Sequence, residues 1–353
     1  MILKKEKEDF LVEEILDEEI ISKEPSNYHL YNLKKTNYTT ERAIQHIAKA
    51  LHIPRKFISY AGAKDKNAIT KQHIVIKGAN KEKISKLKLK DLELNFISYA
   101  KKHLQLGNLK GNKFHIVIRN LKEDETLKET KNPQSLIVPN YFDEQRFSTK
   151  NVDIGLAILK KEFSKAVDIL SEDKDSSSMN EWLKKHENDF VGALQKMPKK
   201  ILLFFIHSVQ SKLFNDLLSE EIKLYCEKTN NKIKIINYSQ GKLIFPTQKF
   251  HEENEEKYFL EKEISLIGFN NDLTENEKLI LKKNNIEQND FINKQLPSLS
   301  IEGGNRKAFF LVTECVIEKA EDDDLFEDKK KQLVSFTLNK GSYATIVLKQ
   351  LYD

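Results

Sequence analysis

The stretch FISYAGAKDKNAITKQHIVIKG, residues 57–78, sets the first structural prediction for this chain. It opens with apolar residues, Gly62 permits a tight turn, and a β-branched run through Ile74 and Ile76 follows. Between the turn and that run lie Lys64, Asp65 and Lys66. The pattern therefore predicts two strands joined by a charged loop.

The segments around this stretch extend the prediction. YHLYNLKK (28–35) alternates like a strand, and TTERAIQHIAKALHI (39–53) has a helical apolar stripe with Thr40 as its N-cap. FHIVIR (114–119) places alternate apolar residues on one face of a strand. DFLVEEILDEEI (9–20) fits either a strand or a short helix. The first third of the chain is thus predicted to be rich in β-structure.

The pattern changes after about residue 136. Helices are predicted at 153–170, 180–196 and 201–227, the last strongly amphipathic. Two strands and a final helix follow, within residues 309–351. Strand-rich ends that share one sheet, with a helix-rich middle inserted, give an α+β architecture.

Charge is distributed unevenly along the sequence. The whole chain carries +5, but residues 51–120 hold 16 Lys and Arg against 4 Asp and Glu, a local charge of +12. Such a segment favours a polyanion partner, because each neutralised phosphate releases a counterion. A lysine-rich solvated surface explains the same count equally well.

Several classes of protein are excluded by the sequence. Cys226 and Cys315 are the only cysteines, too few for a disulfide framework or a zinc cluster. No HExxH, GxSxG, Walker A or GxGxxG motif occurs. The N-terminus lacks a signal-peptide core, and the longest apolar run, 201–206, is too short to span a membrane. We therefore expect a soluble, cytoplasmic protein without membrane association.

Asp65 is the acid of interest because it stands alone among the lysines of the charged loop. An ionised, well-held carboxylate can act as a nucleophile or a general base. The same residue also fits a charged hairpin tip that forms an intrachain ion pair. Residue chemistry alone leaves both interpretations open.

Residues 60–72, YAGAKDKNAITKQ, resemble the signature of the tRNA pseudouridine synthase D (TruD) family. Further blocks resemble that family in the same order and spacing, over about residues 2–351. They are EDFLVEE (8–14), LGNLKGNKFHIVIR (106–119), VPNYFDEQRFS (138–148), HSVQSKLFNDLLSE (207–220) and GSYATIVLKQL (341–351).

The resemblance implies a fold and an activity. The fold is a mixed or antiparallel pseudouridine-synthase sheet domain, residues 1–136 plus 311–353, interrupted by an inserted α+β TRUD domain, residues 137–310. The activity is isomerisation of a tRNA uridine to pseudouridine, typically at position 13 in the D arm. The family needs no metal and no organic cofactor, and we expect a monomer whose partner is tRNA.

The resemblance also implies roles for particular residues. Asp65 matches the catalytic aspartate, and Lys64 in the same loop is expected to hold phosphate or base. Lys4 and Arg146 lie in matching blocks and are assigned only to RNA contact or structural support. The positions that match the lining of the target nucleotide are Phe10, Asn112, Phe114 and Tyr343, the last of which is often Phe in relatives.

Two alternatives belong to other functional classes. The basic segment alone would fit a non-catalytic protein that binds RNA or folds tRNA. Asp65 would also fit a nucleoside hydrolase, which would release free uracil rather than form a C-nucleoside.

Overall fold

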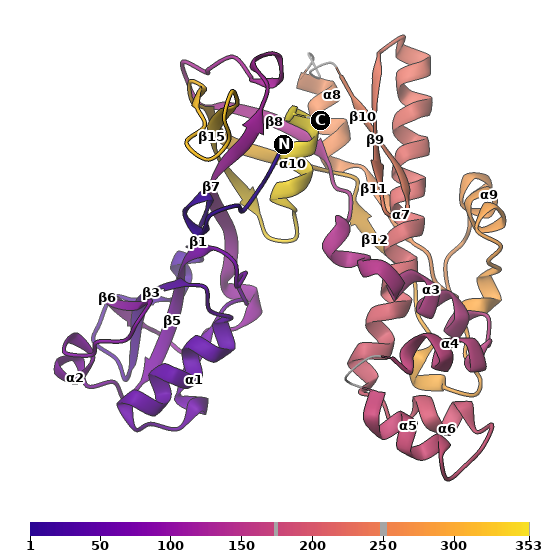
Figure 1. The fold of residues 1–353 in the computed structure, drawn as a ribbon, viewed down its shortest axis with the longest axis horizontal. Helices are drawn as coiled ribbons and strands as arrows, with labels where there is room; N and C mark the ends of the chain where they lie inside the picture. Colours follow the sequence, from indigo (N-terminus) through magenta and orange to yellow (C-terminus); the bar gives the residue numbers. More distant parts are fainter. Residues whose placement is uncertain (173–175, 248–252, 353) are drawn as a thin grey trace. The chain divides into compact units, whose positions relative to one another are not determined.

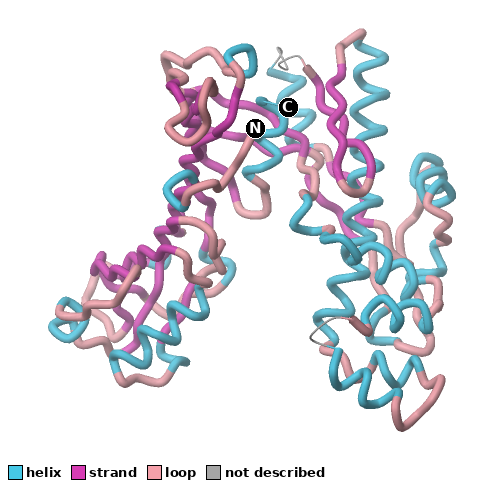
Figure 2. The backbone as a smooth tube through the Cα atoms, in the orientation of Figure 1, coloured by secondary structure: helices cyan, strands magenta, loops and turns pink. Residues whose placement is uncertain are grey.

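A computed structural model describes residues 1–172, 176–247 and 253–352. The chain forms two compact units, and the first draws on both ends of the sequence (Figure 1). Unit 1 comprises Met1–Leu136, Leu311–Ala344 and Tyr352; unit 2 comprises Ile137–Phe310 and Thr345–Leu351. Unit 1 is mainly strand, whereas unit 2 is mainly helix (Figure 2).

The main sheet of the described residues has 11 strands, in the order β2-β6-β3-β5-β1-β7-β15-β13-β8, with β4 beside β5 and β14 beside β15. The β1–β5 pair is parallel and the other pairs of known register are antiparallel, so the sheet is mixed, as the α+β prediction requires. The strands are β1 Phe10–Leu16, β2 Ile21–Ser22, β3 Tyr28–Thr36, β4 Ile58–Tyr60, β5 Ile69–Lys77, β6 Leu92–Ala100, β7 Leu109–Leu121, β8 Gln134–Pro139, β13 Phe309–Ile317, β14 Glu321–Asp322 and β15 Lys330–Asn339.

The N-terminal segment that fitted either a strand or a helix is a strand, β1. Its residues alternate between buried and half-buried positions, so that Phe10, Val12 and Glu14 share one face. Across the antiparallel β1–β7 pair, Val12 lies opposite Phe114 and Glu14 lies opposite Asn112. The predicted site residues Phe10, Asn112 and Phe114 thus share one face of the sheet with the buried charge of Glu14.

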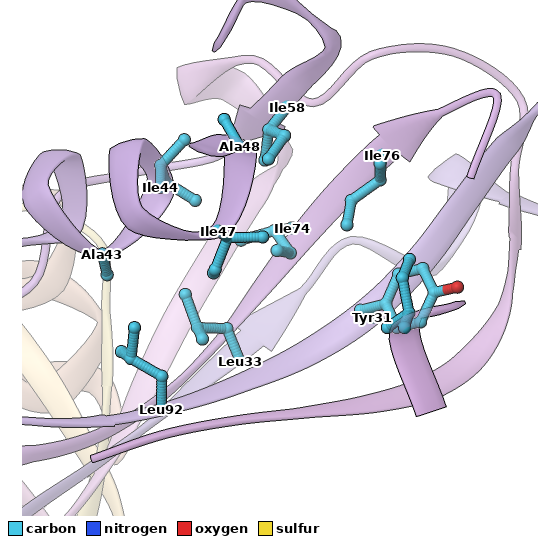
Figure 3. Packing of buried hydrophobic residues seen from close by; sticks show 11 residues of the cluster. Tyr31, Leu33, Ala43, Ile44, Ile47, Ala48, Ile58, Ile74, Ile76 and Leu92 are labelled. Atoms are coloured by element: carbon cyan, nitrogen blue, oxygen red, sulfur yellow. The ribbon is translucent and has the colours of Figure 1, made fainter. Parts of the chain in front are cut away.

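Helix α1, Thr40–Leu51, covers part of this face. Ile44 and Ile47 point from the helix toward Leu33 of β3 and Ile74 of β5 (Figure 3). Each fully buried aliphatic side chain of this cluster contributes about 1.5–3 kcal/mol to the free energy of unfolding, relative to the same side chain exposed to solvent. The shorter helix α2, Lys81–Ser85, precedes β6.

The N-cap of α1 is Thr39, not Thr40 as the sequence predicted. The Thr39 hydroxyl oxygen accepts the backbone N–H of Arg42 at 3.3 Å. Thr40 is the first helical residue, and its buried hydroxyl donates to Gln72 Oε1 at 2.8 Å. Adjacent threonines can both serve as caps, so the sequence could not show which one turns inward.

Unit 2 is built around α7, Lys199–Thr229, which begins after Pro198. α3, Ser148–Leu159, packs against it so closely that a Cβ on Gly155 would lie 2.3 Å from the Phe205 carbonyl oxygen. The predicted one-sided amphipathic pattern is wrong, because α7 also packs against β10 and β11 and buries residues on several sides. The remaining elements are α4 Phe163–Leu170, α5 Ser177–Leu183, α6 Phe190–Leu194, β9 Ile233–Tyr238, β10 Gly241–Pro246, α8 Glu253–Glu261, β11 Glu263–Leu266, α9 Glu275–Lys283 and β12 Gly304–Lys307.

The final helix, α10 (Ala344–Tyr352), groups with unit 2 over Thr345–Leu351, although the sequence prediction placed 311–353 in the first domain. Polar contacts explain the difference. Lys349 Nζ lies 2.7 Å from Asp143 Oδ1, and Lys234 Nζ donates to the carbonyl oxygens of Lys349 and Gln350 at 2.9 Å each. Among the described residues, no helix is both long and apolar enough to cross a membrane.

Candidate active site

Asp65 lies in the loop between β4 and β5, in unit 1. Its side chain is 44% exposed, and its Oδ2 is 2.7 Å from Nζ of Lys4, whose side chain is 23% exposed. The predicted intrachain ion pair therefore exists, but its partner comes from the N-terminal segment and not from the neighbouring lysines of the loop. The carboxylate is paired on one side and accessible to solvent.

Three buried side chains hold the main chain of this loop in place. Lys35 Nζ donates to the Asp65 carbonyl oxygen at 2.7 Å, and the Lys64 backbone N–H donates to Thr40 Oγ1 at 2.9 Å. Gln72 Nε2 makes a longer contact with the Gly62 carbonyl oxygen, at 3.4 Å. Because all three side chains are buried in β3, α1 and β5, the loop is anchored to the packed part of the unit and not to solvent-exposed groups.

Lys64 makes a buried ion pair with Glu14. Its Nζ is 2.6 Å from Glu14 Oε2, and the two side chains are 7% and 0% exposed. Burial alone would raise the pKa of Glu14, but hydrogen bonds from His73 and the charge of Lys64 outweigh it and lower the pKa below its ordinary value. The expectation that Lys64 holds phosphate or base fits poorly with this geometry, which favours an anchoring role for the side chain.

Lys35 is a fully buried cation beneath the loop. Its ammonium also donates to the Tyr38 carbonyl oxygen at 2.6 Å. Burial lowers the pKa of Lys35 to about 8; the nearby Asp65 opposes that shift, and Lys64 adds to it. The Lys35 ammonium thus supports the loop from beneath, and its direct hydrogen-bond partners are main-chain carbonyl oxygens.

Aromatic side chains extend from the Asp65–Lys4 pair along the sheet. Lys4 Nζ lies 4.0 Å from the centre of the Phe10 ring, so one ammonium contacts both the carboxylate and the ring. Phe10 meets Phe114 edge to face at 6.1 Å between ring centres, and Phe114 contacts Phe336 at 5.6 Å. Phe10 and Phe114 are both buried in this structure.

Asn112 lies on the same sheet face, directly opposite Glu14. Its Oδ1 is buried and has no hydrogen-bond partner among the described residues. The strand is pressed against β15 at this point, because a Cβ on Gly111 would lie 2.3 Å from the Leu338 carbonyl oxygen. That close approach explains the glycine that precedes Asn112.

The structure brings together Asp65, Lys4 and Phe10 by direct contact, and it links Phe114 to them through Phe10. Sheet register places Asn112 on the same face. Tyr343 is half-buried and belongs to the short segment that connects β15 to α10 along the chain. Its role at the target nucleotide stays a prediction.

Sequence reasoning missed the residues beneath the loop. The sequence analysis does not predict a role for Glu14 or Lys35. Each nevertheless occupies an inward position of an alternating strand: Glu14 follows Phe10 and Val12 in β1, and Lys35 follows Tyr31 and Leu33 in β3. The sequence does carry a signal for both residues, because a charged residue on a strand face whose other members are apolar indicates a buried charge with a specific partner. For Thr40, the sequence predicts a helix cap and not a contact with the loop. For Gln72, it indicates only a position in a buried strand.

This arrangement suits chemistry at an electrophilic carbon. In the described part of the chain, no three His, Cys, Asp or Glu side chains gather in a way that could hold a metal ion. A rigidly held, accessible carboxylate beside a cation can attack an electrophilic carbon or stabilise a cation that forms there. The aromatic rings next to the ion pair, together with the unpartnered Asn112 Oδ1 on the same sheet face, can receive a flat heterocycle with polar edges.

Comparison with known proteins shows which proteins this chain resembles. The family model "tRNA pseudouridine synthase D (TruD)" matches residues 1–184 and 173–351. A Methanococcus maripaludis protein named "Probable tRNA pseudouridine synthase D 1" is 30% identical over 402 aligned positions, which cover 100% of each chain. The "tRNA pseudouridine synthase D" of Aquifex aeolicus is 28% identical over 397 positions, covering 99% of this chain and 97% of its own. A crystal structure assigned to TruD, from Methanosarcina mazei, matches with a TM-score of 0.75 at 25% identity, covering 99% of this chain and 93% of that chain.

Proposed function

The chain belongs to the tRNA pseudouridine synthase D (TruD) family of isomerases, and from this premise we propose that it converts one tRNA uridine, at position 13 of the D arm, to pseudouridine with Asp65 as its catalytic group. The observation that carries the proposal is the state of Asp65. Its main chain is fixed from below by Lys35, while its carboxylate is accessible and paired with Lys4. A merely structural acid in this loop would have no need of both features.

The reaction is an intramolecular transfer without change of oxidation state. The C1′–N1 bond breaks, uracil turns within the site, and C5 bonds to C1′. The C5 proton then leaves for solvent or a nearby base, and N1 takes up one proton in exchange. The Asp65 carboxylate acts either by attacking C1′ or by stabilising the cationic sugar after uracil departs. Both routes need an ionised oxygen held at C1′, and the contacts beneath the loop supply that rigidity.

The target uridine must leave its stack before the carboxylate can reach its sugar. We assign replacement of the lost stacking to Phe10, Phe114 and Tyr343, at roughly 1–3 kcal/mol for a base on an aromatic ring. The amide of Asn112, whose Oδ1 is buried without a partner, would pair with the imide edge of uracil. Since both phenylalanines are buried, binding would require the base to insert beside them or displace one of them.

We further assign unit 1 to catalysis and the part of unit 2 within residues 137–310 to an inserted domain that contacts tRNA. Unit 1 contains the whole basic segment 51–120, with its local charge of +12. These lysines would hold the phosphate backbone by charge and shape, whereas the target itself is selected at the Asp65 loop.

The proposal is tested with tRNA that carries tritium at C5 of uridine. Wild-type protein should release tritium and form pseudouridine, and Asp65→Asn should reduce the rate on the order of a thousandfold or more. Asp91→Asn is the matched control, because it removes an exposed carboxylate from the same basic segment, and it should keep the wild-type rate.

Three outcomes would contradict the proposal. Wild-type protein that binds tRNA without releasing tritium would be an RNA-binding or tRNA-folding protein. Free uracil in place of pseudouridine would indicate a nucleoside hydrolase. Full tritium release by Asp65→Asn would remove Asp65 from the mechanism.

A further inference from the structure

The buried ammonium of Lys35 has no role in the assignments above beyond anchoring the loop. It is fully buried in β3, and its hydrogen bonds go to two carbonyl oxygens, those of Asp65 at 2.7 Å and Tyr38 at 2.6 Å. Among the described residues, no carboxylate lies within ion-pair distance of it. A buried cation without an ionic partner is costly, so this chain bears a stability cost at that position.

The surroundings of Lys35 show what that charge faces. Across the sheet, Thr70 of β5 and Leu92 of β6 lie opposite it, and neither carries a charge. The charged groups that act on Lys35 are Asp65 and Lys64, and both belong to the loop. The ammonium is therefore directed at one short segment, the one that carries the proposed catalytic carboxylate.

We propose that Lys35 is a positioning residue for the isomerisation: its buried ammonium holds the Asp65 main chain and thereby aims the Asp65 carboxylate at the target ribose. This inference rests on the proposed function, because it assumes that Asp65 carries the chemistry. Lys35 touches only the main chain of Asp65 and Tyr38 and reaches no solvent, so it acts through Asp65 and not on the RNA.

The charge state of Lys35 makes the proposal measurable. Because burial lowers the pKa of Lys35 to about 8, the ammonium loses its proton at a pH where exposed lysines keep theirs. A neutral amine donates weaker hydrogen bonds than an ammonium and no longer places a positive charge beneath the Asp65 loop, so its hold on the Asp65 and Tyr38 carbonyl oxygens weakens. Turnover at saturating tRNA should then fall as pH rises through about 8, with little change in tRNA binding.

The experiment measures kcat and KM for tritium release from C5-labelled tRNA between about pH 7 and pH 9. The variants are Lys35→Met and, as the matched control, Lys34→Met, which removes the neighbouring lysine on the opposite face of β3, where it pairs with Glu93 at 3.0 Å. We expect Lys35→Met to lower kcat at pH 7 on the order of tenfold to a hundredfold, with KM within about threefold of wild type. Its kcat should no longer fall with rising pH, whereas Lys34→Met should behave like wild type.

The wild-type pH profile needs no substitution, so the proposal stays testable even if Lys35→Met fails to fold. A wild-type kcat that does not fall across this pH range would overturn it, as would a folded Lys35→Met that keeps the wild-type kcat or changes only KM. Asp65→Asn, measured in parallel, separates the two proposals. If Asp65→Asn is inactive and Lys35→Met is fully active, only the role of Lys35 fails; if Asp65→Asn is active, both fail.

Discussion

The two ion pairs of the Asp65 loop differ in how deeply they are buried and in whether their carboxylate remains accessible to solvent and substrate. Lys64 and Glu14 are 7% and 0% exposed, whereas Lys4 and Asp65 are 23% and 44% exposed. A buried pair satisfies both charges within the protein, while an exposed pair exchanges readily with solvent or substrate. The buried Glu14 carboxylate therefore holds the loop in place through Lys64, and the Asp65 carboxylate of the loop stays accessible to solvent and substrate.

This difference teaches why adjacent residues of one loop have separate roles. Lys64 points inward to Glu14 of β1, and Asp65 next to it points outward to Lys4. The side chains of these two consecutive residues leave the main chain toward different partners, one buried and one exposed. Stability should depend on the inward pair, and turnover should depend on the outward one.

The largest expected effect on stability comes from Glu14→Gln. This change leaves the Lys64 ammonium buried without a countercharge, which should lower the free energy of unfolding by about 3–5 kcal/mol. Urea denaturation measures it. Glu13→Gln is the control, because Glu13 pairs on the other face of β1 with a partly exposed Lys71 and should change stability by less than about 1 kcal/mol. Equal losses from the two variants would show that burial does not separate the pairs.

The stability conferred by Glu14 should also depend on pH. Its folded-state pKa lies below the ordinary value of 4.5, so the carboxylate stabilises the fold above pH 4.5 and that contribution is lost as pH falls through the folded-state pKa. The gap in unfolding free energy between wild type and Glu14→Gln should therefore narrow below pH 4.5. A gap that is constant over this acidic range would contradict the assigned ion pair.

Thr40→Val tests the main-chain anchor of the inward residue. The substitution leaves the Lys64 N–H and the Gln72 side chain without their buried partner, at a cost of about 1–3 kcal/mol. Thr39→Ala, which removes the N-cap next to it, should cost about 1 kcal/mol. Of these two threonines, Thr40 is the one that hydrogen-bonds to the loop. Tritium release should therefore fall in Thr40→Val and stay unchanged in Thr39→Ala, when both are measured at a temperature at which they are folded. A comparable loss of activity in both variants would mean that the helix, and not the loop contact, is responsible.

The sequence was sufficient for the sheet that carries the site but not for the support beneath it. Period-two alternation predicts β7 and β3, and the structure confirms both strands. The resemblance predicts Asp65 as the catalytic acid. The sequence does not predict the role of Lys35, because its partners are main-chain carbonyl oxygens that residue types do not reveal. Main-chain contacts of this kind depend on the path of a loop, which is decided by the tertiary fold.

Lys64 shows the same limit from the other direction. A lysine beside the proposed catalytic aspartate in a basic segment suggests phosphate binding, and no local pattern shows that it turns toward Glu14, 50 positions away along the chain. The amphipathic pattern predicted for α7 is wrong for a related reason. α3 on one side and the strands β10 and β11 elsewhere around the helix bury several of its faces, and the local sequence does not show these contacts.

The smallest expected effect on stability, and the sharpest test of the comparison, is Lys4→Met. Since the Lys4–Asp65 pair is partly exposed, its loss should change the free energy of unfolding by less than about 1 kcal/mol. Turnover should nevertheless fall, because Lys4 is the direct partner of the Asp65 carboxylate and also contacts the Phe10 ring. Lys5→Met is the matched control, since Lys5 lies next in sequence, 5.8 Å from the Phe326 ring, and it should alter neither quantity. The combination of an intact fold with slow tritium release would place the outward pair in the chemistry, whereas a Lys4→Met protein as active as wild type would reduce that pair to a surface contact and leave the exposed carboxylate without its assigned partner.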